Sequence, residues 1–231
     1  MTTPRWNPLR LLQTLAYFQV VPFFGSLDWL FPAPPIALAT PPTAPMNSPT
    51  LTLFDFSQLN PTLEQVWGAV DDVVMGGVSE SQMQWRDQRA IFAGVVSTGN
   101  GGGFASVRTR NLNPPLNLEG YQGLTLQVRG DGQRYKFLLR CQGGWDSLAY
   151  AAGFDTVADL PPAQWQTVTI PWEQMRPVFR AKTVSNAPPL ASNQITSLQI
   201  MLSKFEYDGE LNQNFRPGAF QLEVRSIAAY R

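Results

Sequence analysis

The sequence predicts an all-β protein, a jelly-roll β-sandwich with a short helical extension at its N-terminus. From Leu51 onward the apolar residues recur with a period of two rather than 3.6, as Leu124, Leu126 and Val128 illustrate. The segments with this period are short and are separated by clusters of Gly, Pro, Asn and Asp. Many short strands with such turns are typical of sandwiches and jelly rolls.

Residues 1–33 are interpreted as a hydrophobic attachment segment. Its apolar stretch runs from Leu9 to Phe31, with a helix expected from Pro8 to about Val21. Polar residues and Pro22 interrupt the stretch, which disfavours a transmembrane helix because such a helix needs roughly 20 mostly apolar residues. The attachment residues are expected to be Leu11, Leu12, Leu15, Phe18, Phe23, Phe24, Trp29 and Leu30.

Three roles for this segment stay open. It could be a signal peptide cleaved at the small-x-small site Ala37-Leu38-Ala39, which would mean export. It could fold back and pack on the main domain. We favour the third role, adhesion to a membrane surface or to a partner's groove.

A change of composition near Pro49 separates this segment from the main domain. The first 50 residues contain 10 of the 20 prolines, one of the 18 glycines and only three charged residues. Residues 34–50 are therefore predicted to be an extended, proline-rich tether. Residues 51–231 are predicted to form the jelly-roll domain around one core.

The main domain is expected to contain about ten strands. The Asp131-Gly132 pair, between two alternating segments, is interpreted as a hairpin turn. A short helical turn is expected at most around 172–178. The predicted strands are Leu51–Phe56, Ser81–Trp85, Ala90–Val96, Phe104–Thr109, Leu124–Arg129, Tyr135–Arg140, Leu148–Phe154, Gln166–Ile170, Gln194–Leu202 and Phe220–Ala228.

Composition excludes several classes of function. The chain has no histidine, which removes His-based catalytic relays and imidazole metal sites. The single cysteine, Cys141, cannot form an intrachain disulfide or a thiolate zinc cage, and nothing nearby in sequence would activate it. The 17 basic residues balance the 17 acidic ones, which argues against a generic nucleic-acid partner. We expect no cofactor, no metal and no catalytic residue.

Two motifs could carry chemistry but have structural explanations. Asp71-Asp72 is an adjacent carboxylate pair, for which a solvated loop or a turn-capping role is expected. The glycine clusters 75–77 and 99–103 lack the Lys-Ser/Thr ending of a phosphate loop. They more plausibly supply turns or close approaches. Most of the seven tryptophans are expected in the core or at strand ends.

Taken together, the motifs resemble the complex I intermediate-associated protein 30 family. Asp71-Asp-Val-Val-Met-Gly-Gly-Val-Ser79 is followed by Gly102-Gly-Phe-Ala-Ser-Val-Arg108, and these two spellings are specific when they occur together. Leu126-x-Val-Arg-Gly-Asp-Gly132 and Gly218-x-Phe-x-Leu-x-Val224 extend the resemblance. It covers roughly residues 54–228. The scarcity of lysine favours a bacterial, cyanobacterial member.

The resemblance implies a galactose-binding-like jelly roll that acts in assembly of a membrane-embedded electron-transfer complex. No catalytic residues are established for the family, so the resemblance implies none in this chain. A shared partner-binding surface would comprise Trp67, Asp71, Met75, Gly76, Gly77, Ser79, Phe104 and Arg108. The alternative is that these residues hold the sandwich together, with Trp67 in the core and Asp71 paired with Arg108.

The functional prediction is therefore a non-enzymatic assembly or accessory factor. Its expected partners are subunits or assembly intermediates of a photosynthetic or NADH-dehydrogenase complex, with peripheral membrane contact. We expect it on the cytoplasmic side of a thylakoid or plasma membrane. The alternative is a carbohydrate-binding module, recognisable by a row of exposed aromatics on one sheet face.

Overall fold

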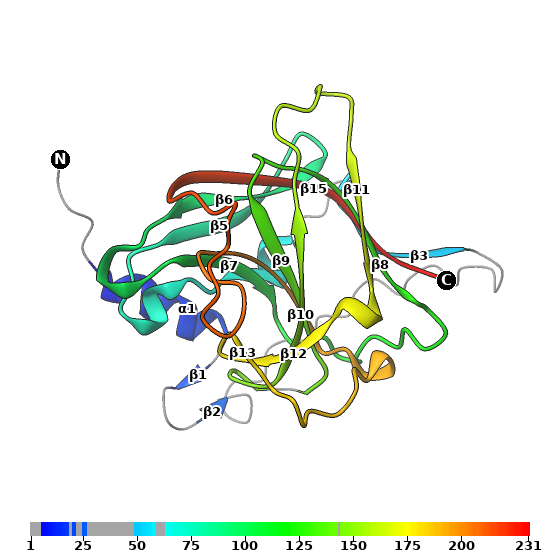
Figure 1. Cartoon of the computed structure of the whole chain (residues 1–231), viewed down its shortest axis with the longest axis horizontal. Coiled ribbons are helices and arrows are strands. Elements are labelled where there is room, and N and C mark those ends of the chain that lie inside the picture. Colours follow the sequence, from blue (N-terminus) through cyan, green and yellow to red (C-terminus); the bar gives the residue numbers. More distant parts are fainter. Residues whose placement is uncertain (1–5, 19, 22–24, 27–48, 59–62, 143) are drawn as a thin grey trace.

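The computed structural model describes residues 6–18, 20–21, 25–26, 49–58, 63–142 and 144–231. In this part of the chain, two antiparallel sheets face each other and enclose one large core, which confirms the predicted β-sandwich (Figure 1). The 6-stranded sheet has the order β11-β8-β15-β6-β5, with β3 added against β15. The 7-stranded sheet has the order β13-β12-β10-β9-β14-β7-β4.

The strands of the main domain lie close to their predicted positions. Sequence reasoning missed three of them, the short β4, β12 and β13. The bounds of the strands are β3 Thr50–Asp55, β4 Trp67–Ala69, β5 Glu80–Arg86, β6 Arg89–Val96, β7 Phe104–Thr109, β8 Gly123–Arg129, β9 Arg134–Arg140, β10 Ala149–Asp155, β11 Gln166–Pro171, β12 Arg176–Phe179, β13 Lys182–Thr183, β14 Ser197–Ser203 and β15 Gly218–Tyr230.

Short helical turns connect some of these strands. The most important is η1, which follows β4 and lies within the family motif. The expected helical turn near Trp172 is η3. These elements are α2 Leu63–Val66, η1 Asp72–Met75, η2 Gly99–Gly101, η3 Trp172–Gln174 and η4 Ser192–Gln194.

The predicted hairpin at Asp131-Gly132 is wrong. β8 pairs with β11 and β15, whereas β9 pairs with β10 and β14, so the chain crosses from one sheet to the other here. Gly132 does adopt the left-handed conformation expected of a turn. However, Asp131 accepts hydrogen bonds from the hydroxyl of Tyr135 and the backbone N–H of Gln221, which fix the crossing. Apolar residues alternate in both strands because each strand contributes side chains to the same core, but from opposite sheets.

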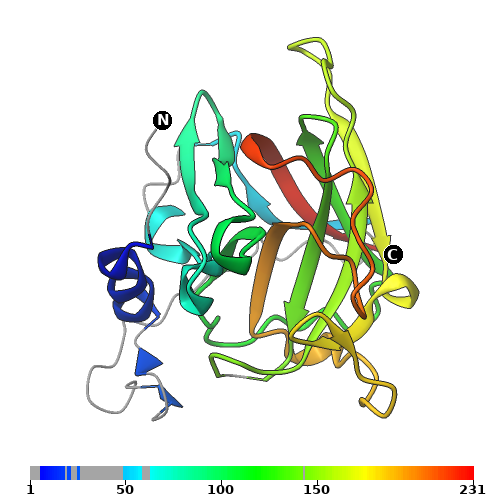
Figure 2. The same cartoon turned by 60° about the vertical axis from the view of Figure 1, so that its left-hand side comes forward.

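The N-terminal helix α1 spans Pro8–Tyr17 and lies outside the sandwich, beside β4 and η1 (Figure 2). Asn7 caps it by accepting hydrogen bonds from two N–H groups of the first turn, and Pro8 suits the first helical position. The helix ends before the predicted Val21, because Val20–Val21 forms a short strand β1 that pairs with β2, Gly25–Ser26. β-branched residues ahead of Pro22 disfavour helix continuation. The expected tether 34–50 lies almost entirely outside the described residues.

Candidate functional site

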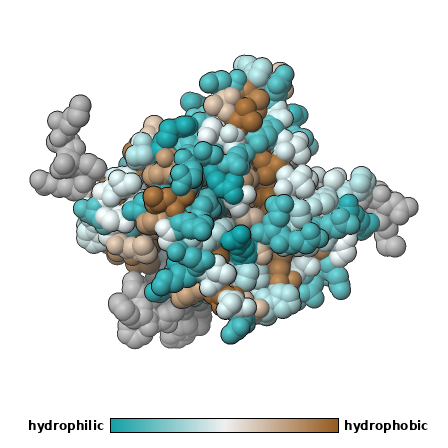
Figure 3. All heavy atoms as spheres, in the orientation of Figure 1, coloured by the Kyte–Doolittle hydropathy of each residue, from teal (hydrophilic) through white to brown (hydrophobic). Residues whose placement is uncertain are grey.

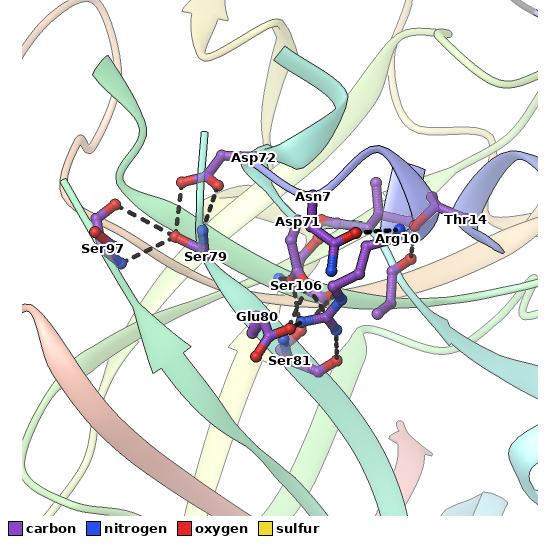
Figure 4. Close-up of polar contacts among 12 residues, drawn as sticks. Asn7, Arg10, Thr14, Asp71, Asp72, Ser79, Glu80, Ser81, Ser97 and Ser106 are labelled. Atoms are coloured by element: carbon purple, nitrogen blue, oxygen red, sulfur yellow. Dashed lines mark hydrogen bonds and ion pairs between the residues drawn. The ribbon is translucent and has the colours of Figure 1, made fainter. Parts of the chain in front are cut away.

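The two adjacent carboxylates of the family motif are buried in the protein and point into separate hydrogen-bond networks (Figure 4). Asp71 is 1% exposed and Asp72 is fully buried, so of the two expected roles, a solvated loop or turn capping, the solvated loop is wrong. Asp71 precedes η1 and Asp72 is its first residue. The divergence of the two side chains follows from this change of backbone direction.

Asp72 joins three loops. Its Oδ1 accepts from the backbone N–H of Ser79 at 2.9 Å, and its Oδ2 accepts from the Ser79 hydroxyl at 2.7 Å. Oδ2 also accepts from the backbone N–H groups of Gly103 at 2.7 Å and Phe104 at 3.2 Å. The carboxylate therefore ties the loop after η1 to the loop after η2.

Two glycines of the motif make room for this carboxylate. A Cβ atom at Gly77 would lie 2.3 Å from the Asp72 carboxyl, and one at Gly102 would lie 2.4 Å from its Oδ2. Gly76, in contrast, serves the backbone, because it ends η1 in the left-handed conformation. The expected roles of the glycine clusters, turns and close approaches, are therefore confirmed at these positions.

Asp71 joins strands β5 and β7. It accepts from the backbone N–H of Ser81 at 2.8 Å, from the Ser81 hydroxyl at 2.5 Å and from the N–H of Ser106 at 3.0 Å. Burial raises the pKa of Asp71 from 3.8 to about 6, and these hydrogen bonds together with the charge of Arg10 oppose the rise.

Helix α1 docks on this motif through its polar side. The Arg10 guanidinium lies 3.7 Å from Asp71 Oδ2, pairs with Glu80 at 2.5 Å and donates to the carbonyl of Ser81 at 3.0 Å. The Trp6 indole N–H donates to the Val73 carbonyl in η1 at 3.1 Å. Arg10 and Thr14 turn toward the sandwich, whereas Leu9 and Leu12 are exposed.

Arg108 does not pair with Asp71 as anticipated. It is 6% exposed and donates to the Trp145 carbonyl at 3.0 Å. Its guanidinium carbon lies over two aromatic rings that contact each other, 4.7 Å from the centre of Phe18 and 4.5 Å from that of Trp145. Phe18, the residue that follows α1, thus contacts a motif arginine and connects the N-terminal segment to the motif.

The end of α1 also requires a glycine in β4. The ring of Tyr17 lies so close to Gly68 that a Cβ atom there would be 2.2 Å from the ring carbon Cε1. Gly68 does not have a left-handed backbone conformation, so alanine could adopt its backbone angles. The alanine Cβ atom would, however, clash with the Tyr17 ring.

We therefore expect Gly68→Ala to loosen α1 while the sandwich stays folded. Limited trypsin digestion of the full-length chain should cleave after Arg10 at least about fivefold faster than in the wild type, since cleavage needs local opening. Adding Tyr17→Ala removes the clash, so Gly68→Ala should have no further effect in that background. An unchanged cleavage rate in the single variant would contradict the tight docking.

The remaining predicted site residues fall into buried and exposed groups. Trp67 is in the core, Gly77 and Ser79 are buried, and Phe104 is half-buried. Met75 is exposed at 70%. Of the predicted attachment residues, Leu12 is exposed, and Leu11, Leu15 and Phe18 are half-buried. Phe23, Phe24, Trp29 and Leu30 lie outside the described residues.

The predicted partner-binding surface omitted Asp72, Ser81, Ser106 and Arg10, although Asp72 was noted as half of an adjacent carboxylate pair. The spacing contains a usable signal for three of them: Ser79 and Ser81 lie two residues apart, as do Phe104 and Ser106, and each pair divides its hydrogen bonds between the two aspartates. Nothing in the sequence marks Arg10, because it acts from a separate segment.

Other functional features were sought in the described part of the chain. Within it, no group of three or more His, Cys, Asp or Glu side chains could hold a metal ion. No described helix combines the length and apolar character that crossing a bilayer requires. Cys141 is half-buried, and burial raises the pKa of its thiol. Trp85 and Trp172 pack on the core and donate to backbone carbonyls.

The fold and this site define a jelly-roll accessory domain whose motif carboxylates are occupied by internal hydrogen bonds. The model of the family described as Complex I intermediate-associated protein 30 matches residues 54–224. The chain belongs to this family. It is an accessory or assembly family rather than a known enzyme family, and membership points to a role related to complex I assembly.

The chain also resembles one protein in sequence and several solved structures in fold. An uncharacterized protein of Schizosaccharomyces pombe is 30% identical over 178 residues, which cover 72% of this chain and 78% of the yeast protein. A family 11 carbohydrate-binding module from Clostridium thermocellum, solved with a β-1,3-1,4-mixed-linked tetrasaccharide, has a TM-score of 0.52 at 14% identity and covers 78% of this chain and 95% of the module. An agarase has a TM-score of 0.50 at 9% identity, covering 80% of this chain and 25% of the agarase. These structures share the fold and confirm the predicted galactose-binding-like jelly roll.

Proposed function

We propose that this protein is a non-enzymatic assembly factor. It binds a subunit or an assembly intermediate of a membrane-embedded electron-transfer complex, of the NADH-dehydrogenase or photosynthetic type, during biogenesis. The observation that carries the proposal is the orientation of α1: its polar side is held on the family motif, and its apolar side chains Leu9 and Leu12 face outward.

The proposed contact surface, which we name the α1–η1 surface, consists of Trp6, Leu9, Leu12 and Met75. Their side chains are 42%, 60%, 61% and 70% exposed, respectively. α1 contacts η1, and Trp6 is bonded to the η1 backbone, so the four come from adjoining elements. Burial of such apolar area yields roughly 25 cal/mol per Å², from which the cost of association is subtracted.

The composition of one molecular face favours a localised apolar contact over general hydrophobic binding. Figure 3 shows that the face seen in Figure 1 is mostly hydrophilic, with hydrophobic groups separated by teal spheres. A ten-residue helix is also too short to span a bilayer. We propose that the protein lies peripherally on the cytoplasmic side of the membrane that holds its client, a thylakoid or plasma membrane.

A non-enzymatic role is supported by the state of the motif carboxylates. Asp71 and Asp72 each accept at least three hydrogen bonds from the protein itself. They are also inaccessible to solvent, so neither is positioned to exchange a proton with a bound substrate.

The test is affinity purification of the tagged full-length protein from gently solubilised membranes, read by mass spectrometry. Enrichment of subunits from one electron-transfer complex is expected. Leu9→Ser combined with Leu12→Ser should reduce their recovery at least about tenfold, because two exposed apolar side chains no longer contribute. Truncation of α1 is a poorer test, since it also removes Arg10 from Asp71.

The matched control combines Val157→Ser and Leu211→Ser, which are 49% and 59% exposed on other loops. It should recover the subunits at the wild-type level. Equal loss in both double variants would contradict a specific α1–η1 surface. Recovery of no complex subunit would overturn the proposed function, and retention of a processed, exported form on polysaccharide resin would favour the carbohydrate-binding alternative.

A further inference from the structure

A group of arginines lies on the outer face of the 7-stranded sheet, under the end of α1. Arg108 belongs to β7 and Arg140 ends β9, with β14 between these strands. Their inward-facing neighbours Val107 and Leu139 belong to the core, so both arginines project from the opposite face. Arg110 follows Arg108 by two residues and shares its face.

Gln199 of β14 links the two strand arginines. It pairs with Arg108 in the sheet register, and its side-chain carbonyl accepts from Arg140 Nη1 at 2.7 Å. Its amide in turn donates to the Ser106 hydroxyl at 2.8 Å. The repulsion between the two guanidinium groups contributes to a lowered pKa of Arg108, about 9, for which burial is the main cause.

These cations lack a counter-ion among the described residues. No described carboxylate lies within 4.0 Å of Arg108, Arg110 or Arg140. The Nε atoms of Arg110 and Arg140 are buried without an acceptor. Asp146 is near enough to favour the charged forms of Arg108 and Arg140, but its carboxylate pairs with Arg180.

Contacts with aromatic rings compensate only in part for the missing counter-ions of these arginines. Phe18 and Trp145 cover Arg108, and the Tyr17 ring centre lies 4.3 Å from Arg110, which also forms a hydrogen bond with the Tyr17 side chain. A cation–aromatic contact contributes less than a charge-assisted hydrogen bond to an anion. A buried guanidinium Nε–H without an acceptor is destabilising, and such unsatisfied groups concentrate at binding sites.

We propose that Arg108, Arg110 and Arg140 bind a phosphate group. Three guanidinium groups suit a compact dianion with several acceptor oxygens better than a single carboxylate, because each planar fork can donate two hydrogen bonds. Arg110 and Arg140 are half-buried, and Asp146, whose side chain is 41% exposed, marks the solvent side. This site is independent of the proposed assembly role.

The experiment follows thermal unfolding of the full-length protein in inorganic phosphate against sodium chloride at equal ionic strength. At about ten times Kd, phosphate should raise Tm by about 3–6 °C. Arg140→Gln should abolish this rise, whereas Arg86→Gln, an exposed arginine of β5, should retain it. Phosphate titration calorimetry on both variants gives the same comparison if Arg140→Gln lowers the basal Tm.

A second arm identifies the source of the phosphate. Co-sedimentation with vesicles of phosphatidate in phosphatidylcholine, lost in Arg140→Gln, would indicate a lipid headgroup; phosphate binding without co-sedimentation would indicate a free phosphate. No phosphate-specific rise in Tm and no Arg140-dependent co-sedimentation would overturn the site. So would an equal response of wild type and Arg140→Gln.

Discussion

Asp72→Ala should lower the free energy of unfolding by roughly 3–5 kcal/mol. The variant leaves the backbone N–H groups of Ser79, Gly103 and Phe104 without their acceptor in a site that is fully buried. Each unsatisfied buried donor carries a penalty of roughly 1–3 kcal/mol. Denaturant unfolding of the full-length protein measures the difference.

Ser79→Ala is the matched control, because it removes one hydroxyl donor but leaves the carboxylate and the backbone bonds in place. It should cost about 1 kcal/mol. A loss of less than about 1 kcal/mol in Asp72→Ala would show that water or a rearranged loop satisfies these groups, and would contradict the role assigned to this carboxylate.

Stability should also depend on the ionisation of Asp71, which Asp71→Asn removes. The folded pKa of about 6 exceeds the ordinary 3.8, so the folded state holds this proton more tightly than the unfolded state does. The associated stabilisation is fully present below about pH 3.8 and is lost as pH rises through about 6. The wild type should therefore lose roughly 2 kcal/mol relative to Asp71→Asn between about pH 4 and pH 7.

Denaturant unfolding of both proteins across that range provides the measurement, and other titrating groups cancel in the difference. Arg10→Gln is the useful companion, since it removes an opposing charge while burial, the main cause, remains. The pH dependence should persist in that variant. Parallel pH profiles for wild type and Asp71→Asn would show that the folded pKa is not raised.

The sandwich could be predicted from sequence because apolar residues at every second position mark the buried face of each strand. Strand pairing could not, because alternation does not say which sheet a strand joins: Leu126 and Phe137 both face the core, yet they come from opposite sheets. The short strand at Trp67 was missed for a related reason, since three residues are too few to show a period.

The site was predictable as a motif but not as an arrangement. The spelling around Asp71 identified the family, whereas burial of both carboxylates depends on η1 turning the chain between them. The docking side of α1 was equally hidden. The apolar side of a helix is ordinarily expected to face the domain. Here Arg10 faces the domain instead, because it forms ion pairs with Asp71 and Glu80. The proposed attachment and the fold-back of this helix are therefore compatible.

The nested pairing of two aspartates with two serines also fixes the length of the chain between them. Asp72 accepts a hydrogen bond from Ser79 and Asp71 accepts one from Ser81. The Asp72–Ser79 pair therefore lies inside the Asp71–Ser81 pair along the chain, around the same turn. An insertion or deletion of one residue between 73 and 78 would shift both serines together and break both pairs at once. The number of residues between 73 and 78 is therefore as constrained as their identity.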